Sequence, residues 1–407
     1  MSSNQQTTGP LNGLRVIDLT RVFAGPLCTQ TLADQGADVI KVEPPSGDET
    51  RNWGTAQHGD RSTYFDGLNR NKRSIALDLS NPAGREVLLD LLKDADVLVH
   101  NFKLGTLPRW GLGYEDVLSK LYPKLVQCTI TGFGADGPLA GRPGYDVVVQ
   151  GFTGLASING EAGGHGNKTG VPLIDHATGL MAVNSIMMAL FERERSGRGQ
   201  HVSVSLFNTG LSMLHPASTT WMATGKIPQP TGNTEIWVAP YGAYACKDGR
   251  IFTGAGNDRA FSKLCRALGA PELADDPRFL TNADRVANKA ALDETIEALT
   301  AEHYAETLAL NLLDAGVPAG PFLNMEQVFA QAQVQANGMW INTPEYQATG
   351  LPMHFSRTPG AVRLIPPHFA AHTDEILAEI GYTSDRIEQI ESSCGLVRAR
   401  SRLMAEA

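Results

Sequence analysis

Several features are scarce in this sequence of 407 residues, and each scarcity excludes a class of protein. The five cysteines are widely scattered and form no CxxC pair or Cys/His cluster, which argues against a zinc site and against a disulfide framework. No apolar stretch approaches the roughly 18 residues that span a bilayer, and Met1 to Gly9 lack the apolar core of a secretory signal. Positive charge is in deficit, because the net charge is −9, which argues against nucleic acid as a general partner. These absences predict a cytoplasmic protein that binds neither membranes nor nucleic acid.

The length favours two domains, and the first 130 residues have the pattern of an α/β fold. Short apolar runs alternate there with amphipathic segments, which predicts a parallel sheet covered by helices on both faces. We expect strands at residues 14–19, 38–43, 96–99 and 125–131, and helices at 26–35 and from Pro82, with Asn81 as the cap. Ligands of such sheets bind beyond the carboxyl ends of the strands.

A change of pattern near residue 225 predicts a second, smaller α+β domain. A hairpin is expected from residues 241–246 and 250–253, joined through Lys247-Asp248-Gly249, and helices from about 258–268, 289–299 and 305–315. In the tail, Thr373 is expected to cap a helix that ends at Gly381. The predicted organisation is a large domain over residues 1–224, a small domain over 225–330 and a C-terminal segment over 331–407.

Asp175 is the most informative single residue. It follows the short apolar run 171–174 and precedes a helix expected over 177–195. At a strand-to-helix turn, the positive end of the helix macrodipole would favour the ionised carboxylate. An ionised and accessible carboxylate can attack an acyl carbon and form a covalent intermediate. The alternative is that Asp175 is only the N-cap of that helix, a common position for aspartate.

Three other motifs allow more than one interpretation. Gly132-Phe-Gly-Ala-Asp-Gly137 has the form GxGxxG, but the proline and glycines that follow predict a loop instead of the helix of a dinucleotide site, which disfavours a nicotinamide or flavin enzyme. The cations Arg70, Lys72 and Arg73 suit phosphate groups or form a solvated surface. Tyr145-Asp146 could line a pocket beside Asp175, or could be a half-buried tyrosine and a turn aspartate.

Each motif alone is weak evidence, but their order along the chain is highly specific. They are Leu11-Asn-Gly-Leu-Arg-Val-Ile-Asp-Leu-Thr20, Ala24-Gly-Pro26, Gly36-Ala-Asp-Val-Ile-Lys-Val-Glu43, Gly47-Asp48, Asn69-Arg-Asn-Lys-Arg-Ser74, Asn101-Phe102, Gly111-Leu-Gly-Tyr-Glu115, Gly132-Phe-Gly134, Gly144-Tyr-Asp146, Asp175, Ser196-Gly-Arg-Gly-Gln200 and, in the tail, His372-Thr-Asp-Glu-Ile-Leu377. In this order they closely resemble the class III CoA-transferases of the formyl-CoA transferase and carnitine CoA-transferase type.

This resemblance implies both a fold and a reaction. The fold would be a Rossmann-like large domain with a parallel sheet, a small domain, and a C-terminal segment that returns to the large domain, with two chains interlocked as a homodimer. Asp175 would be the nucleophile that takes the acyl group and then CoA, so that acyl-CoA and a small carboxylic acid are the substrates and no tightly bound cofactor is needed. The positions that would hold CoA are Phe23, Ala24, Leu77, Ser80, Asn101, Phe102, Arg109, Tyr145 and Asp146, with Lys103 as a further candidate for a phosphate.

Departures from the family pattern narrow the range of acids that we expect as substrates. Formyl-CoA transferases have Gln at the position of Phe23, Arg at that of Pro44, and a run of glycines that residues 229–240 lack, which disfavours formate and oxalate. We expect short mono- or dicarboxylic acids, with succinyl-CoA or acetyl-CoA as the donor. The main alternative is a 2-methylacyl-CoA racemase of the same fold, but such enzymes have histidine where this chain has Tyr145, and a tyrosine with a pKa near 10 is a poor base. A CoA-binding protein without catalytic activity is a further alternative.

Overall fold

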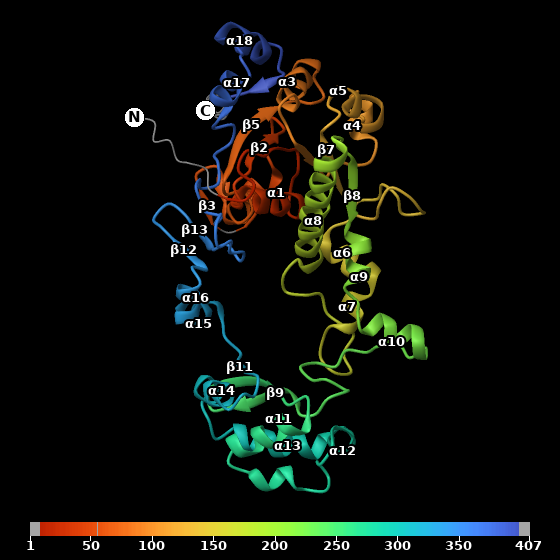
Figure 1. The fold of residues 1–407 in the computed structure, drawn as a ribbon, viewed down its shortest axis with the longest axis vertical. Helices are drawn as coiled ribbons and strands as arrows, with labels where there is room; N and C mark the ends of the chain where they lie inside the picture. The colour runs from red at the N-terminus through yellow and green to blue at the C-terminus, as the bar shows by residue number, and fades with distance from the viewer. Residues whose placement is uncertain (1–8, 55, 399–407) are drawn as a thin grey trace. The chain divides into compact units, whose positions relative to one another are not determined.

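The chain folds into two compact units (Figure 1). A computed structural model describes residues 9–54 and 56–398. The large unit comprises residues 1–155, 169–219 and 336–407, and the small unit comprises residues 156–168 and 220–335. Each unit has its own hydrophobic core, which is the arrangement expected of a chain too long for a single core.

The large unit is built on a mostly parallel seven-stranded sheet with the order β14-β5-β2-β1-β6-β7-β8. Only the edge strand β14 is antiparallel to its neighbour. Because β2 lies on one side of β1 and β6 on the other, the chain direction across the sheet reverses between β1 and β6, where α/β folds bind ligands. The strands are β1 (Arg15–Asp18), β2 (Asp38–Glu43), β5 (Lys72–Leu77), β6 (Val97–His100), β7 (Val126–Thr131), β8 (His201–Ser205) and β14 (Leu396–Val397).

Helices cover both faces of this sheet because successive strand residues point to opposite faces. Ile17 and Ile40 belong to the core formed with α3 (Pro82–Leu92), α17 (Thr373–Glu379) and α18 (Ser384–Ser392). Their neighbours Val16 and Val39 belong to the core formed with α1 (Ala24–Asp34) and α8 (Leu173–Ser196). The predicted doubly covered parallel sheet is therefore confirmed.

The remaining elements of the large unit are short. They are η1 (Glu49–Asn52), β3 (Gln57–His58), β4 (Arg61–Ser62), α2 (Thr63–Asp66), α4 (Thr106–Arg109), η2 (Tyr114–Leu118), α5 (Ser119–Leu121), α6 (Asp146–Thr153), α9 (Leu206–Ser212), β12 (Trp340–Asn342) and β13 (Gln347–Thr349), while α7 (Leu155–Ile158), α10 (Ala217–Thr224) and α16 (Ala332–Ala336) lie at the boundaries between the units. No helix forms between β7 and α6, so the predicted loop after Gly132 is confirmed.

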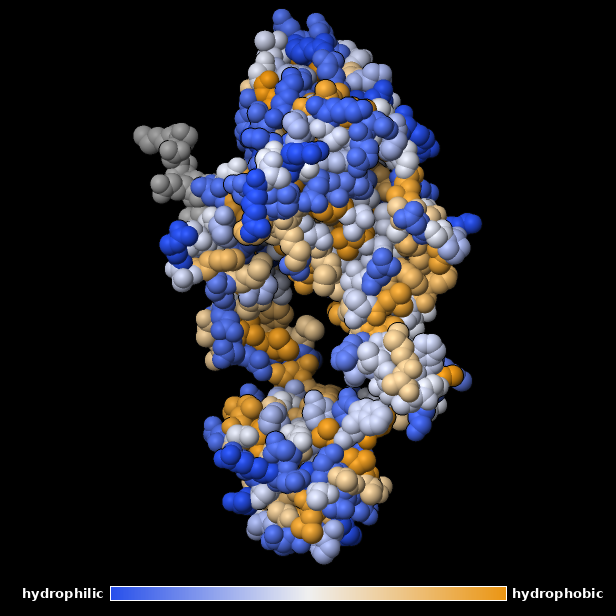
Figure 2. Space-filling view, turned by 45° about the vertical axis from the view of Figure 1, so that its right-hand side comes forward, coloured by the Kyte–Doolittle hydropathy of each residue, from blue (hydrophilic) through white to orange (hydrophobic). Residues whose placement is uncertain are grey.

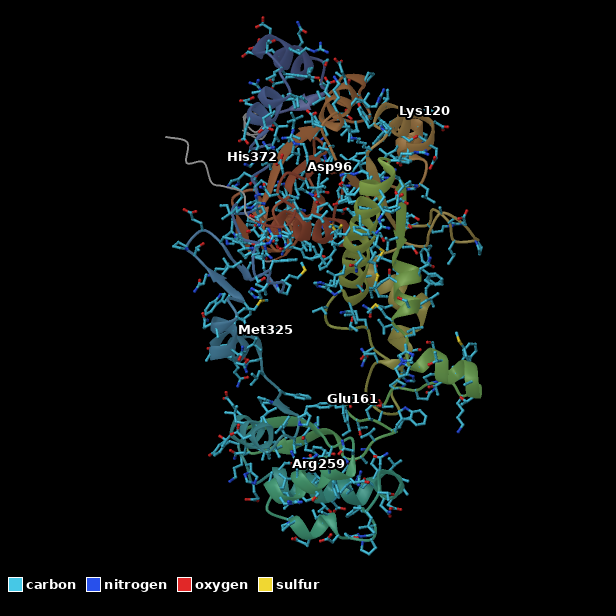
Figure 3. All side chains as sticks on the ribbon, in the orientation of Figure 1. Asp96, Lys120, Glu161, Arg259, Met325 and His372 are labelled. Carbon is cyan, nitrogen blue, oxygen red and sulfur yellow. The ribbon has the colours of Figure 1, made fainter. Side chains whose placement is uncertain are left out.

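The predicted helix starts are partly right. Asn81 caps α3 as expected, since its side-chain oxygen accepts the Ala83 amide at 2.9 Å. Thr373 does not cap α17: the helix begins at Thr373 itself, and the Thr373 hydroxyl donates to the Ala370 carbonyl at 2.8 Å. The preceding residue, His372, joins the tail to β5, because its amide donates to the Ser74 carbonyl at 3.0 Å (Figure 3).

The small unit contains the predicted hairpin. Strands β9 (Tyr241–Cys246) and β10 (Gly249–Gly254) pair antiparallel across the two residues Lys247 and Asp248, and β11 (Ala319–Pro321) pairs with β10. The helices of the unit are α11 (Asp258–Ala267), η3 (Pro271–Ala274), α12 (Asn282–Ala287), α13 (Lys289–Thr300), α14 (Ala305–Asp314) and α15 (Met325–Ala330). Helices α11, α13 and α14 lie within one or two residues of their expected positions.

Helix α8 is unusually apolar for a helix with an exposed side. Leu180, Met188 and Phe191 are 49%, 72% and 63% exposed, and apolar residues form patches on the molecular surface (Figure 2). In the described part of the chain, α8 is the one helix whose length and composition match those of a membrane-spanning helix, and 39% of its most apolar stretch is buried.

Candidate active site

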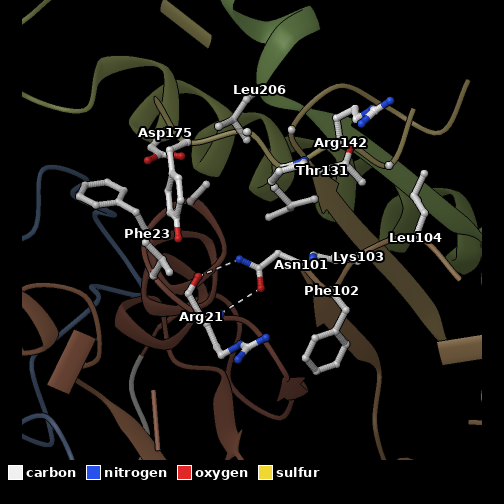
Figure 4. Close-up of a pocket in the computed structure, with 18 of the residues that line it drawn as sticks. Arg21, Phe23, Asn101, Phe102, Lys103, Leu104, Thr131, Arg142, Asp175 and Leu206 are labelled. Carbon is white, nitrogen blue, oxygen red and sulfur yellow. Dashed lines mark hydrogen bonds between the residues drawn. The ribbon is translucent and has the colours of Figure 1, made fainter. Parts of the chain in front are cut away.

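A cavity of about 250 Å³ opens in the large unit where β1, β6 and β7 end. Its walls come from the segment after β1, the segment after β6, the loop between β7 and α6, and the first turn of α8 (Figure 4). It therefore lies at the reversal point of the sheet, where the parallel topology predicts a ligand. The residues that line it include Arg21, Val22, Phe23, Ala24, Glu49, Asn101, Phe102, Lys103, Arg142, Tyr145 and Asp175.

Asp175 is the third residue of α8 and faces this cavity. The helix begins at Leu173, with Pro172 before it, so Asp175 is neither at the end of a strand nor an N-cap. Both of these expectations are wrong for the same reason: the apolar run 171–174 enters the helix instead of forming a strand. The position is nevertheless in the first turn, with the side chain partly buried.

The electrostatic surroundings of Asp175 shift its pKa in the direction opposite to the one expected. Burial, together with the nearby charge of Asp146, raises the pKa of Asp175 to about 7. The expectation that the macrodipole favours the ionised form is therefore wrong, because desolvation and a like charge outweigh the helix terminus. Around neutral pH this carboxylate is divided between its two protonation states.

Asp146 supports Asp175 through the backbone. It is the first residue of α6, is only 7% exposed, and accepts the Asp175 amide at 3.0 Å with Oδ2. Its Oδ1 accepts a short bond from Gln150 Nε2, and Gln150 Oε1 accepts the Thr169 amide at 2.9 Å. Both oxygens of Asp146 are thus engaged inside the protein, and Asp146 is not among the residues that line the cavity.

An aromatic wall flanks Asp175. The ring of Phe23 meets that of His176 edge-on, with centroids 4.7 Å apart, and lies 6.0 Å from that of Tyr64. Burial and the charge of Asp175 raise the pKa of Tyr64 to about 12, so this hydroxyl stays protonated. The start of α1 packs tightly on α8, because a Cβ at Gly179 would lie 2.8 Å from the Ala24 carbonyl oxygen.

Asn101 binds the segment opposite Asp175. Its Oδ1 accepts the Arg21 amide at 3.0 Å, and its Nδ2 donates to the Arg21 carbonyl at 2.7 Å (Figure 4). The Arg21 guanidinium lies 5.6 Å from the centre of the Phe102 ring. The two segments that follow β1 and β6 are thereby held together.

A second cavity of about 350 Å³ adjoins the first, since Arg21, Phe102 and Lys103 line both. Its walls are mainly apolar, from Val42, Pro44, Pro45, Leu77, Leu79 and Trp110, with Ser80 among the polar groups. Such a surface suits a flat ring. The side chains of Arg21, Lys103 and Arg142 form no ion pair with any described carboxylate.

The structure brings most of the predicted site residues together. Phe23, Ala24, Asn101, Phe102, Lys103, Tyr145 and Asp175 line the first cavity, and Leu77, Ser80, Phe102 and Lys103 line the second. Arg109 lines neither; its guanidinium donates to the Thr106 hydroxyl at 3.3 Å. The sequence interpretation did not include Arg21, Glu49 or Arg142. Arg21 could have been found, because it lies in the first turn after a parallel strand.

The cationic cluster after residue 69 is not available to phosphate. Arg70 pairs with Asp34 at 2.7 Å, Lys72 with Asp18 at 3.1 Å, and Arg73 with Asp38 at 2.8 Å. All three cations are buried. The alternative of a solvated surface is equally wrong, since these cations compensate acidic residues inside the large unit.

Comparison with known proteins agrees with this geometry. Residues 11–373 match the CoA-transferase family III. The chain is 39% identical to a succinate–glutarate CoA-transferase of Agrobacterium fabrum over 91% of this chain and 96% of the relative. It is 40% identical to an acetyl-CoA:oxalate CoA-transferase of Acetobacter aceti over 88% and 93%. A CAIB/BAIF family protein from Brucella suis has the same fold, with a TM-score of 0.83, 41% identity and coverage of 92% of this chain and all of that one. The chain therefore belongs to the class III CoA-transferases and is an enzyme that transfers coenzyme A from acyl-CoA.

Proposed function

We propose that this enzyme moves CoA from an acyl-CoA donor to a carboxylic acid through covalent intermediates on Asp175. The observation that carries the proposal is the position of Asp175 in this cavity, where no described cation offsets the burial and the like charge that raise its pKa. A carboxylate left without compensation is more reactive as a nucleophile than one held in an ion pair. The neighbouring Asp146 carboxylate is occupied by backbone and amide donors and is not available for attack.

The reaction proceeds in four transfers. The ionised Asp175 attacks the donor thioester carbon, the C–S bond breaks, and a mixed anhydride and CoA thiolate result. The thiolate attacks the aspartyl carbon of the anhydride, which releases the donor acid and leaves an aspartyl-CoA thioester. The acceptor carboxylate then attacks this thioester and expels the thiolate, and the thiolate takes the acceptor acyl group from the new anhydride. Every step conserves an activated acyl bond, so free Asp175 is regenerated without another energy source.

Burial of the nucleophile favours these intermediates. Acylation removes the negative charge of Asp175, so the desolvation cost and the repulsion from Asp146 disappear in both the anhydride and the thioester. The tetrahedral intermediates carry oxyanions that need hydrogen-bond donors. Backbone amides of the Val22–Ala24 wall are suitable donors, since this wall and Asp175 line the same cavity.

The two adjoining cavities suggest how CoA binds. We place the adenine ring against the apolar walls of the second cavity and the pantetheine arm in the first, with its thiol directed to Asp175. Arg21 and Lys103 stand where the cavities meet and have no described acidic partner, so they are suited to the phosphate groups. This assignment keeps Lys103 as a phosphate ligand and adds Arg21.

The acids are proposed from the relatives. A Homo sapiens protein that is 37% identical over 97% of this chain is a succinyl-CoA:glutarate CoA-transferase, and a Chloroflexus aurantiacus relative is a succinyl-CoA–D-citramalate CoA-transferase. We therefore propose succinyl-CoA as the donor and a short dicarboxylic acid as the acceptor. We also propose that a second copy of the chain covers the exposed apolar residues of α8, because such residues are common at obligate interfaces.

Chemical trapping tests the proposal. The protein is incubated separately with succinyl-CoA and acetyl-CoA, then treated with borohydride, which reduces an aspartyl-CoA thioester to homoserine. We expect a mass change confined to the peptide that carries Asp175 and absent from an Asp175→Asn variant. An unmodified peptide with both donors, combined with loss of an α-deuteron from a 2-methylacyl-CoA, would overturn the transferase mechanism in favour of a racemase.

A further inference from the structure

The segment from Thr20 to Gly25 is held at several points below the cavity. The Thr20 amide and hydroxyl both donate to Asp18 Oδ1, at 2.8 and 2.6 Å, and Lys41 Nζ donates to the Thr20 carbonyl at 2.9 Å. The chain then turns back so closely that a Cβ at Gly25 would lie 2.4 Å from the Thr20 Cβ. The beginning of the segment is thus fixed by buried charge.

Val22, within this segment, has an unusual backbone conformation. Its φ angle is 72°, in the left-handed region that β-branched residues rarely adopt. Such a conformation is strained and persists only where neighbouring contacts impose it. Val22, Phe23 and Ala24 together form the cavity wall, so the strain lies in the wall itself.

Asn101 makes the contacts that can impose this conformation. Its carboxamide binds both the amide and the carbonyl of Arg21, the residue directly before Val22. This pair of bonds sets the orientation of the carboxamide. In the reversed orientation, the Asn101 NH₂ group would face the Arg21 amide, and both groups are donors. Phe23, directly after Val22, packs on His176 beside Asp175. A shift of Arg21 would therefore be transmitted to the wall that faces Asp175.

We infer that Asn101 is a positioning residue for the acyl-transfer steps, which holds Val22 in its strained conformation and so fixes Phe23 and Ala24 against Asp175. This inference rests on the proposed covalent role of Asp175. It gives Asn101 a role different from that of a CoA ligand, because the oxygen and one N–H of its side chain are engaged by Arg21. The role is exerted through the backbone of another segment.

The first test separates positioning from binding. We expect Asn101→Ala to lower kcat roughly 10²-fold, as a displacement of about 1 Å does in other enzymes, while KM for the CoA donor changes less than about threefold. A matched control is Asn71→Ala: the Asn71 side chain also joins distant backbone, accepting the Arg363 amide and donating to the Ala361 carbonyl, but lies outside both cavities. It should lower the melting temperature and leave kcat unchanged. A large rise in KM with an unchanged kcat in Asn101→Ala would show that Asn101 is a ligand and overturn the inference.

The second test addresses the strain at Val22. Glycine adopts a φ of 72° without strain, whereas alanine removes the side-chain branch and keeps most of the strain. In the Asn101→Ala background we expect Val22→Gly to restore kcat about fivefold or more, and Val22→Ala to restore clearly less. Equal rescue by both, or rescue by neither, would overturn the inference, because the loss would then not arise from the conformation of Val22.

Trapping distinguishes failure of this inference from failure of the proposed function. If the wild-type protein forms no Asp175 adduct, the covalent mechanism fails. If the wild type forms the adduct and Asn101→Ala forms it at the same rate, only the positioning role fails. We expect the adduct in both proteins, with its formation in Asn101→Ala slowed by the same factor as kcat.

Discussion

Two regions of the large unit contain carboxylates that are shielded from solvent. In one region the carboxyl pKa values are lowered, and in the other the carboxyl pKa is raised. Under the segment after β1, three acidic residues each face a cation: Asp18 with Lys72 at 3.1 Å, Asp48 with Lys41 at 2.9 Å, and Glu43 with Arg51 at 2.6 Å. Burial raises the pKa of each of these carboxyls, but the neighbouring cations outweigh burial, and all three pKa values are lowered. At the start of α8, Asp175 has Asp146 as its charged neighbour, and its pKa is raised to about 7.

The difference separates carboxylates whose charge stabilises the fold from the one that we propose takes part in the reaction. A compensated carboxylate is stable as an anion and poorly suited to attack, whereas an uncompensated one gains by becoming acylated. The compensated region lies beneath the strained wall at Val22, and the uncompensated region lies across the same cavity. Substitutions in the compensated region should therefore mainly lower stability. Substitutions in the uncompensated region should mainly lower activity.

Removal of the proposed nucleophile should give the largest effect. Asp175→Asn keeps the shape of the side chain and abolishes the attacking carboxylate, so we expect kcat to fall on the order of 10⁴-fold or more. The measurement is CoA transfer from succinyl-CoA, with glutarate and oxalate as separate acceptors. Retention of more than a tenth of the activity would show that Asp175 is not the covalent residue.

Breaking the compensated region should cost stability instead. Lys72→Met leaves Asp18 buried without its cation, and we expect a loss of about 3–5 kcal/mol in the free energy of unfolding. Urea unfolding at neutral pH provides the measurement. The double variant Asp18→Asn/Lys72→Met should recover much of this loss, because no uncompensated charge remains; a double variant as unstable as Lys72→Met would show that packing, not charge, is responsible.

The sequence could predict the sheet but not every strand. Strands buried on both faces are continuous apolar runs, and this is why β1, β2, β6 and β7 were recognisable. Strand β8, His201–Ser205, alternates polar and apolar residues at the sheet edge, and β14 has only two residues. Arg70, Lys72 and Arg73 suggested either a phosphate site or a solvated surface, because the acidic residues that pair with them in the fold are 35 to 54 positions away in sequence.

The residues of the site were predictable from ordered motifs, whereas their electrostatics were not. Asn101, Tyr145 and Asp175 come from separate segments and line one cavity, as the resemblance implied. The sign of the Asp175 pKa shift depends on its burial and on Asp146, which lies 29 residues earlier. A helix macrodipole can be inferred from local sequence, but desolvation and a distant like charge require the fold.

The stability of the protein should itself reveal the uncompensated carboxyl. The pKa of Asp175 is about 7 in the folded protein and near 3.9 when unfolded, so between these pH values the folded state holds a proton that the unfolded state has lost. Stability therefore falls as pH rises from about 4 to 7. Asp175→Asn removes this loss, and the variant should be more stable than the wild type at pH 8 by about 2 kcal/mol. This is about half of the free energy that the full pKa difference would give, because the Asp175 side chain keeps some contact with solvent. Equal stability at pH 8 would contradict the raised pKa.

A change at Asp146 should produce the smallest but most specific effect. Asp146→Asn keeps an oxygen that can accept the Asp175 amide and removes the like charge, so the pKa of Asp175 should fall. Because kcat/KM reports the free enzyme, its acid limb should lie near pH 7 in the wild type and move to lower pH, by roughly one unit, in the variant. Burial, the larger cause, remains in the variant and keeps the limb above that of an ordinary aspartate. An unmoved limb would mean that burial alone sets the reactivity of Asp175, and that its partner acts only through the hydrogen bond.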